Sequence, residues 1–177
     1  MSWATGGPGD VRLDAEDKAI AIGEIAALLR IGTEQEPALL GRLADEALAM
    51  AEHFTGQALI VRDVTERVRA DGDWHRLMAT PVRSIALATT PGNAIDIDAA
   101  GDGWVKLARG AAPLAVSYQA GLATSWAELP AGLRGGIARL AAHRFDARDD
   151  DQVPPAAVAA LWRPWRRMRI AASAPAP

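Results

Sequence analysis

The chain has 177 residues, of which 50% are hydrophobic and 23% charged, with 19 basic against 22 acidic side chains. This length fits one domain with a sizeable core, because domains cluster near about 100–150 residues. A formal net charge of −3 at pH 7 argues against a chain-wide electrostatic attraction to nucleic acid or anionic lipid. The absence of cysteine excludes disulfide scaffolds, thiol catalysis and cysteine-ligated zinc or iron–sulfur sites.

The N-terminal region is rich in glycine and proline and shows no periodicity. Residues 1–13 are therefore predicted to form a flexible arm. We expect no signal peptide, because no basic region precedes an apolar run. We also expect no membrane span, because no apolar stretch approaches the ~20 residues that crossing a bilayer requires.

Two amphipathic helices are predicted next, over residues 14–31 and 34–55, because apolar residues recur there at helical spacing. Asp14 and Asp17 are placed to cap the first helix. The second begins with a capping-box pattern from Thr33 to Glu36, and Gly56 follows it at the place of a left-handed C-terminal cap.

The pattern changes over residues 58–120, where short runs are separated by turn signals such as Asp71–Asp73. This spacing predicts a small antiparallel sheet or hairpin region inserted between helices. At its start, Ile60, Val64 and Val68 recur every fourth residue, and this periodicity suits a helix as well as a strand.

Helical periodicity returns over residues 127–148, and a shorter helix is predicted over residues 155–163. The predicted fold class is therefore α+β, with a helical core of about four helices and the inserted β region. Residues 14–161 would form this domain.

The sequence contains no recognisable catalytic or metal-binding motif. His53, His75 and His143 stand far apart and lack partners at metal-ligand spacing. The acidic run Asp149–Asp151 lacks the pattern of a calcium loop and is interpreted as solvated. We therefore predict no enzyme activity, no cofactor and no metal.

A ten-residue segment near the C-terminus combines two tryptophans and four arginines with no acid. Tryptophan and arginine are enriched at interface hot spots, so residues 162–177 are predicted to be a partner-binding tail without a fold of its own. Its predicted contact residues are Trp162, Arg163, Trp165, Arg166, Arg167, Met168, Arg169 and Ile170. In the alternative interpretation, Leu161 and Trp162 cap the core and the arginines pair with Asp149–Asp151.

Six segments together resemble a known family. In chain order they are Leu28–Ile31, the helix end Ala51–Gly56, Pro81–Ile85, the strand end Val116–Gly121, Leu129–Phe145 and Val153–Ile170. Their order and spacing resemble the head-to-tail connector (adaptor) proteins of long-tailed bacteriophages and of alphaproteobacterial gene transfer agents, over residues 16 to 170. Trp165 departs from the family, which has a tyrosine or similar ring there, and residues 88–112 follow it only in being hairpin-like.

The resemblance implies a structural protein of a phage-like particle that assembles in the bacterial cytoplasm. Family members form a ring of about twelve copies under the capsid portal, extend the DNA channel and dock the next neck stopper or tail protein. By this analogy the tail binds the portal protein, and DNA passes through without sequence-specific binding.

Two alternatives remain open. Within the same class, the chain could be a neck stopper or a tail-completion protein one layer further down. In a different class, the paired helices and the arginines could belong to a DNA-binding regulator, whose affinity for duplex would fall steeply with salt.

Overall fold

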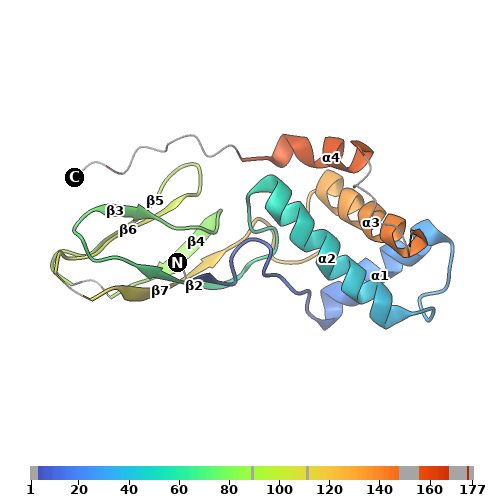
Figure 1. Cartoon of the computed structure of the whole chain (residues 1–177), viewed down its shortest axis with the longest axis horizontal. Coiled ribbons are helices and arrows are strands. Elements are labelled where there is room, and N and C mark those ends of the chain that lie inside the picture. The colour runs from blue at the N-terminus through green and yellow to red at the C-terminus, as the bar shows by residue number, and fades with distance from the viewer. Residues whose placement is uncertain (1–3, 89, 111, 148–155, 168–174, 176–177) are drawn as a thin grey trace.

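The computed structural model describes residues 4–88, 90–110, 112–147, 156–167 and 175. Figure 1 shows an elongated molecule whose helices gather at one end and whose strands gather at the other. The strands come from the segment between the second and third helices and from two residues near the N-terminus. The predicted α+β fold, with a small antiparallel sheet region inserted in a helical core, is therefore confirmed.

The helices differ from their predicted bounds mainly at their N-terminal ends. They are α1 (Ala15–Leu29), α2 (Pro37–Thr55), α3 (Ala131–Asp146) and α4 (Ala156–Trp162), and a 3-10 turn, η1 (Arg163–Trp165), follows α4. The predicted Asp14 cap of α1 is present, since the Asp14 carboxylate accepts a hydrogen bond from the Asp17 N–H at 2.9 Å. Asp17 does not cap the helix, because its carboxylate accepts the Trp126 N–H at 2.8 Å instead. The capping-box prediction for α2 is wrong, because Glu36 has a left-handed backbone (φ 51°) and the helix begins only at Pro37.

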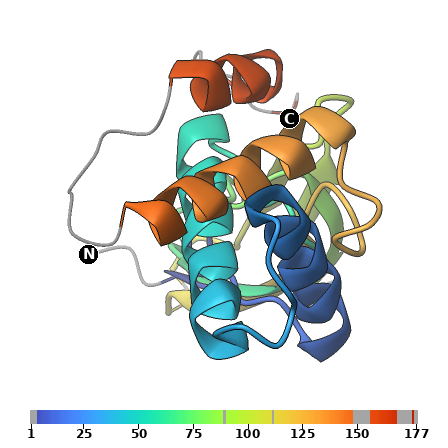
Figure 2. The same ribbon diagram turned by 90° about the vertical axis from the view of Figure 1, so that its right-hand side faces the viewer.

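The helical lobe buries one continuous apolar core. Figure 2 shows α1, α2 and α3 packed on one another, with α4 lying across α3. The largest fully buried apolar side chains of this core are Ile25, Leu40, Leu48, Leu59, Trp126, Leu133, Ile137 and Leu140. Each such side chain contributes about 1.5–3 kcal/mol to folding, so this core fixes the position of everything that packs on it.

The strands form two antiparallel sheets with a second core between them. They are β1 (Ala4–Thr5), β2 (Arg62–Val68), β3 (Trp74–Arg76), β4 (Val82–Ala86), β5 (Ala94–Ile97), β6 (Gly103–Lys106) and β7 (Leu114–Ala120). One sheet has the order β1-β2-β7-β4 and the other the order β3-β6-β5. The ambiguous start of the β region is a strand, in which Val64, Glu66 and Val68 alternate inward with exposed neighbours.

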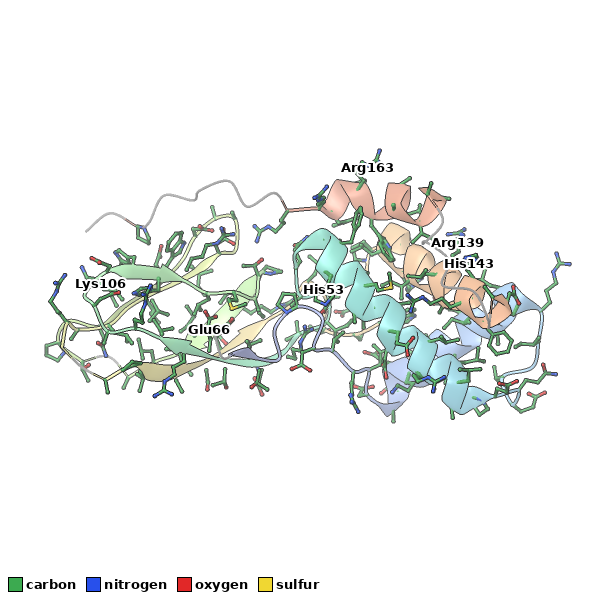
Figure 3. The ribbon with its side chains drawn as sticks, in the orientation of Figure 1. His53, Glu66, Lys106, Arg139, His143 and Arg163 are labelled. Atoms are coloured by element: carbon green, nitrogen blue, oxygen red, sulfur yellow. The ribbon has the colours of Figure 1, made fainter. Side chains whose placement is uncertain are left out.

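A buried polar pair, Glu66 with Tyr118, lies inside this β lobe, and Figure 3 labels Glu66. The Tyr118 hydroxyl donates to Glu66 Oε2 at 3.1 Å and accepts the Ala79 N–H at 3.1 Å. The Met78 N–H also donates to Glu66 Oε2, at 2.8 Å. Burial raises the pKa of Tyr118 well above its usual value, so the hydroxyl keeps the proton that it donates. The pair joins β2, β7 and the loop before β4.

The N-terminal arm is packed against the molecule, contrary to the prediction of flexibility for residues 1–13. β1 pairs antiparallel with β2, and Val11 and Leu13 are only 6% and 5% exposed. The Gly9 N–H donates to Glu52 Oε2 at 2.7 Å. Gly9 has a φ of +89°, and a Cβ there would overlap the His53 ring. The prediction is therefore wrong for residues 4–13, whereas residues 1–3 lie outside the described residues.

A buried ion pair joins the two lobes where α2 ends and β2 begins. Glu52 is fully buried, and Arg62 donates to its carboxylate through both terminal nitrogens, at 2.8 and 2.7 Å. The Gly9 and Leu59 N–H groups complete the carboxylate's bonding. The guanidinium also donates to the carbonyls of Gly6, Gly7 and Ile60. In this Glu52–Arg62 joint, both carboxylate oxygens and all three guanidinium nitrogens have hydrogen-bond partners. A buried ion pair is tolerated under this condition.

Replacing the carboxylate of the joint should destabilise the protein. We expect Glu52→Gln to lower the free energy of unfolding by about 3–5 kcal/mol, because it leaves the largely buried Arg62 without its counter-charge. The matched control on the same helix is Glu46→Gln. Glu46 pairs with Arg42 and with Arg144 at the surface, and each such solvent-screened pair should contribute less than about 1 kcal/mol. Urea unfolding followed by circular dichroism measures both. Equal losses for the two variants would contradict the prediction.

Candidate assembly interface

The residues that follow α4 are fastened to the body of the protein by Trp162. Its side chain is 2% exposed, and its indole N–H donates to the Leu133 carbonyl at 3.4 Å. The ring lies 5.8 Å from that of Phe54, at 57°. A Cβ on Gly136 would overlap the indole, so the absence of a side chain there makes room for it. Trp162 therefore belongs to the helical core.

A second attachment follows at Arg167, which reaches the tip of the β5–β6 hairpin. Its guanidinium lies 3.2 Å from Asp102 Oδ1 and donates to the Ala100 carbonyl. Arg76 on β3 binds the other oxygen of Asp102 at 2.8 Å, and Asp102 is 5% exposed. The Arg167 N–H also donates to the Thr55 carbonyl at 2.8 Å. Arg167 thus links the end of α2 to the β lobe.

These contacts correct the predicted start of the tail. Residues 162–167 are folded on their own chain, so the prediction that the tail lacks a fold from Trp162 onward is wrong for them. The alternative interpretation is right for Trp162, which does cap the core. The predicted ion-pair partners Asp149–Asp151 lie outside the described residues, and Arg167 pairs with Asp102 instead. The remaining contact candidates Met168, Arg169 and Ile170 also lie outside the described residues.

Two arginines of the segment point outward and form what we call the C-terminal basic surface, consisting of Arg163 and Arg166. Both are exposed, and Figure 3 shows Arg163 directed away from α4. The Arg166 guanidinium lies 5.8 Å from the centre of the Phe54 ring. Neither arginine has a carboxylate partner in the part of the chain that the structure describes. An exposed guanidinium held in place can bind a partner's carboxylate in a bidentate manner.

The hairpin tip that receives Arg167 is organised by Asp98. Its carboxylate accepts the N–H groups of Ala100 and Asp102, both at 2.9 Å, and the Trp104 indole N–H at 3.2 Å. Although burial raises the pKa of Asp98, these hydrogen bonds and the nearby charge of Arg167 lower it more, so the net shift is downward. The ionised carboxylate therefore holds the tip in shape.

Neither a metal site nor a catalytic constellation stands out among the described residues. They contain no cluster of three or more potential ligand residues. His75 bonds Asp71 at 2.7 Å, whereas His53 and His143 lie on different helices. Within the same residues, no helix is long and apolar enough to cross a membrane.

Sequence reasoning missed Glu52, Arg62 and Asp102. Glu52 carried a signal, because it occupies the position one helical turn after Leu48 in the buried stripe of α2. A carboxylate in such a stripe implies a buried partner. The sequence around Asp102 gives no such signal, since it consists of turn residues. Asp102 forms its ion pairs with Arg76 and Arg167 only in the folded protein.

Removing the Trp162 ring should destabilise the folded chain. We expect Trp162→Ala to lower the free energy of unfolding by about 3–5 kcal/mol, the usual cost of such a cavity. Arg163→Ala, one residue away and exposed, should change it by no more than about 0.5 kcal/mol. Thermal and urea unfolding of the two variants give the comparison. An unaltered stability in Trp162→Ala would mean that the segment is unattached.

The hairpin tip should weaken in acid. Because the pKa of Asp98 is lower in the folded protein than its ordinary value of 3.8, its stabilising effect is complete above about pH 4 and is lost as the pH falls through the lowered pKa. We expect Asp98→Asn to reduce the dependence of unfolding free energy on pH below pH 4. Denaturant unfolding between pH 2.5 and 6 measures the slope. An identical slope in wild type and variant would contradict this assignment.

Comparison with known proteins gives matches among solved structures. No protein-family model matches the sequence, and no curated protein matches it significantly. A chain in the neck of an empty gene transfer agent (GTA) particle, computed with C6 symmetry, aligns with a TM-score of 0.68 and 24% identity. The alignment covers 99% of this chain and 100% of that one.

Two further matches agree with the first. A chain from the virion of a native GTA particle has a TM-score of 0.70 and 24% identity, over 98% of each chain. A chain from the neck of a native GTA particle, computed with C12 symmetry, has a TM-score of 0.64 and 24% identity, over 93% of this chain and 98% of that one. These likenesses show that the protein has the fold of those chains from end to end, as the sequence resemblance implied.

Proposed function

We propose that the protein is a structural head-to-tail adaptor in the neck of a phage-like particle. It forms a ring, of about twelve copies, beneath the capsid portal, where it extends the DNA channel and docks the next neck or tail protein. The proposal includes assembly in the bacterial cytoplasm and no enzymatic activity. The observation that carries it is the match over nearly the whole chain with chains of GTA particles, two of them from necks computed with C6 or C12 symmetry.

The C-terminal segment supports a portal-binding role. Trp162 and Arg167 anchor its start to the helical core and to the hairpin tip. The side chains of Arg163 and Arg166 are exposed to solvent, and neither forms an ion pair with a carboxylate among the described residues. Beyond Arg167 the sequence continues as Met168-Arg169-Ile170, two apolar residues around a further arginine. We propose that the basic surface and residues 168–170 contact the portal protein, while Trp162 and Arg167 position them.

The channel role is consistent with the charge of the chain. A net charge of −3 gives passing DNA little electrostatic attraction, since affinity for duplex rises with each phosphate that a cation neutralises. DNA would therefore move through the ring without sequence-specific binding. If the chain were instead a DNA-binding regulator, it would bind duplex with an affinity that falls steeply as salt is raised.

Truncation after Arg167 tests the portal-binding role. The described contacts of the segment end at Arg167, so we expect the truncated chain to fold with a wild-type melting temperature. Particles made with it should be DNA-filled heads without tails, because the ring cannot attach to the portal. Electron microscopy of purified particles counts the tails. Tailed particles at wild-type frequency would rule out this role for residues 168–177.

A charge reversal isolates the basic surface from the rest of the segment. Arg163→Glu with Arg166→Glu should weaken portal binding and leave stability nearly unchanged, whereas the matched reversal Arg67→Glu, exposed on β2, should leave binding intact. Chemical cross-linking in intact particles identifies the direct neighbour. A cross-link to another neck protein with none to the portal would identify the chain as a neck stopper or tail-completion protein.

A further inference from the structure

The large apolar side chains left exposed among the described residues fall in three places: on α1, on β5 and at the start of β7. Ile20 and Leu28 are 39% and 48% exposed on α1. Ile95 and Ile97 are 46% and 40% exposed on β5, and Leu114 is 43% exposed at the start of β7. Single exposed apolar residues are common on protein surfaces, but Ile95 and Ile97 share one face of β5, and Leu28 lines a groove. These two features are the candidates for surfaces that a partner covers.

The first place includes a groove between α1 and α3. It has a volume of about 330 Å³. Its lining, which we call the helical groove, consists of Glu24, Ala27, Leu28, Gly135, Ala138 and Arg139. The small residues of α3 leave the space, and Leu28 forms an apolar wall. The groove therefore has room for an apolar side chain of another molecule.

The rim of the helical groove carries a positive charge that is not neutralised. The one acid of the rim, Glu24, is already paired with Arg134 at 3.3 Å. Arg139, labelled in Figure 3, is exposed and donates to the Gly135 carbonyl of its own helix at 3.3 Å. No described carboxylate lies within ion-pair distance of it. A ligand for this groove should therefore combine apolar side chains with an acid.

Strand β5 combines exposed apolar side chains with an acid in this way. We call Ile95, Asp96 and Ile97 the β5 strip. β5 pairs with β6 along one edge and is the last strand of its sheet. Ile95 and Ile97 project on one face and Asp96 on the other. Asp96 is exposed and has no described ion-pair partner. A neighbour that approaches the open edge can contact both faces of the strand.

We infer that the β5 strip of one copy docks into the helical groove of the next copy. Ile95 and Ile97 pack against Leu28 and the small residues of α3, and Asp96 pairs with Arg139 at the rim. The two surfaces lie on different lobes, so the contact is heterologous and can repeat around an axis until it closes. This inference rests on the proposed ring and identifies the surfaces that build it.

The natural chain contains no cysteine, which allows a direct cross-linking test on the full-length chain. The variant carrying Leu28→Cys and Ile95→Cys should give a ladder of dimers, trimers and larger species after mild oxidation or a short bis-maleimide. Each single variant should stay monomeric, and a mixture of the two single variants should stop at dimers, because a heterologous contact joins one site to the other. The products are separated on a denaturing gel.

A second double variant controls for random collisions. Leu28→Cys with Thr65→Cys places the second thiol on an exposed position of β2, outside the strip, and should give no ladder. The reaction is run on the purified chain and on assembled particles. Necks with ring symmetry but no ladder would overturn the inference and leave the proposed function standing, whereas particles whose necks lack the chain would overturn the proposed function itself.

Charge reversal gives an independent readout. Asp96→Arg and Arg139→Glu should each weaken self-association about tenfold or more, since each places like charges in contact. Combined in one chain, they restore an opposite pair and should recover most of the loss. Asp73→Arg, an exposed carboxylate of the same lobe, should have no effect. Sedimentation velocity and neck occupancy in particles measure assembly, and a double variant no better than the singles would exclude the Asp96–Arg139 pair.

Discussion

The carboxylate of Glu52 and the guanidinium of Arg62 are the contact on which the arrangement of the two lobes depends. Three segments that are distant in sequence meet there: the end of α2, the N-terminal residues around Gly9, and the start of β2. A fully buried charge is costly unless its hydrogen-bonding capacity is filled, and here backbone groups fill it on both sides. The lobes can therefore satisfy this pair in only one relative position.

The C-terminal segment depends on that fixed position. Trp162 packs on the helical lobe, whereas Arg167 reaches Asp102 on the β lobe. Both attachments can form together only if the distance between the lobes is constant. The joint thus presents Arg163 and Arg166 on a rigid support, and a surface that is already organised loses less entropy when it binds. The same constancy would keep the helical groove and the β5 strip at a set spacing around a ring.

The fold class and the order of elements could be predicted from the sequence because they follow from periodicity and turn chemistry. Helical spacing located α1 and α2, and Gly56 ended α2 as predicted. The errors lie where tertiary contacts override local preference. Glycine-rich residues 4–13 are packed because Glu52 and β2 bind them. The segment from Trp162 to Arg167 folds back because Gly136 and Asp102, remote in sequence, provide its sites. Neither the groove nor the β5 strip is visible in a pattern, since each depends on which faces the core leaves uncovered.

The attachment of one short segment to both lobes has a mechanical meaning. A pull on the chain beyond Arg167 reaches the hairpin tip through the Asp102 pair and the end of α2 through the Thr55 carbonyl. The force is therefore shared between the Asp102 ion pair and the hydrogen bond to the Thr55 carbonyl. Trp162, which precedes both attachments in the chain, is buried in the helical core. A segment attached at two points resists a pulling force that would detach a segment attached at only one.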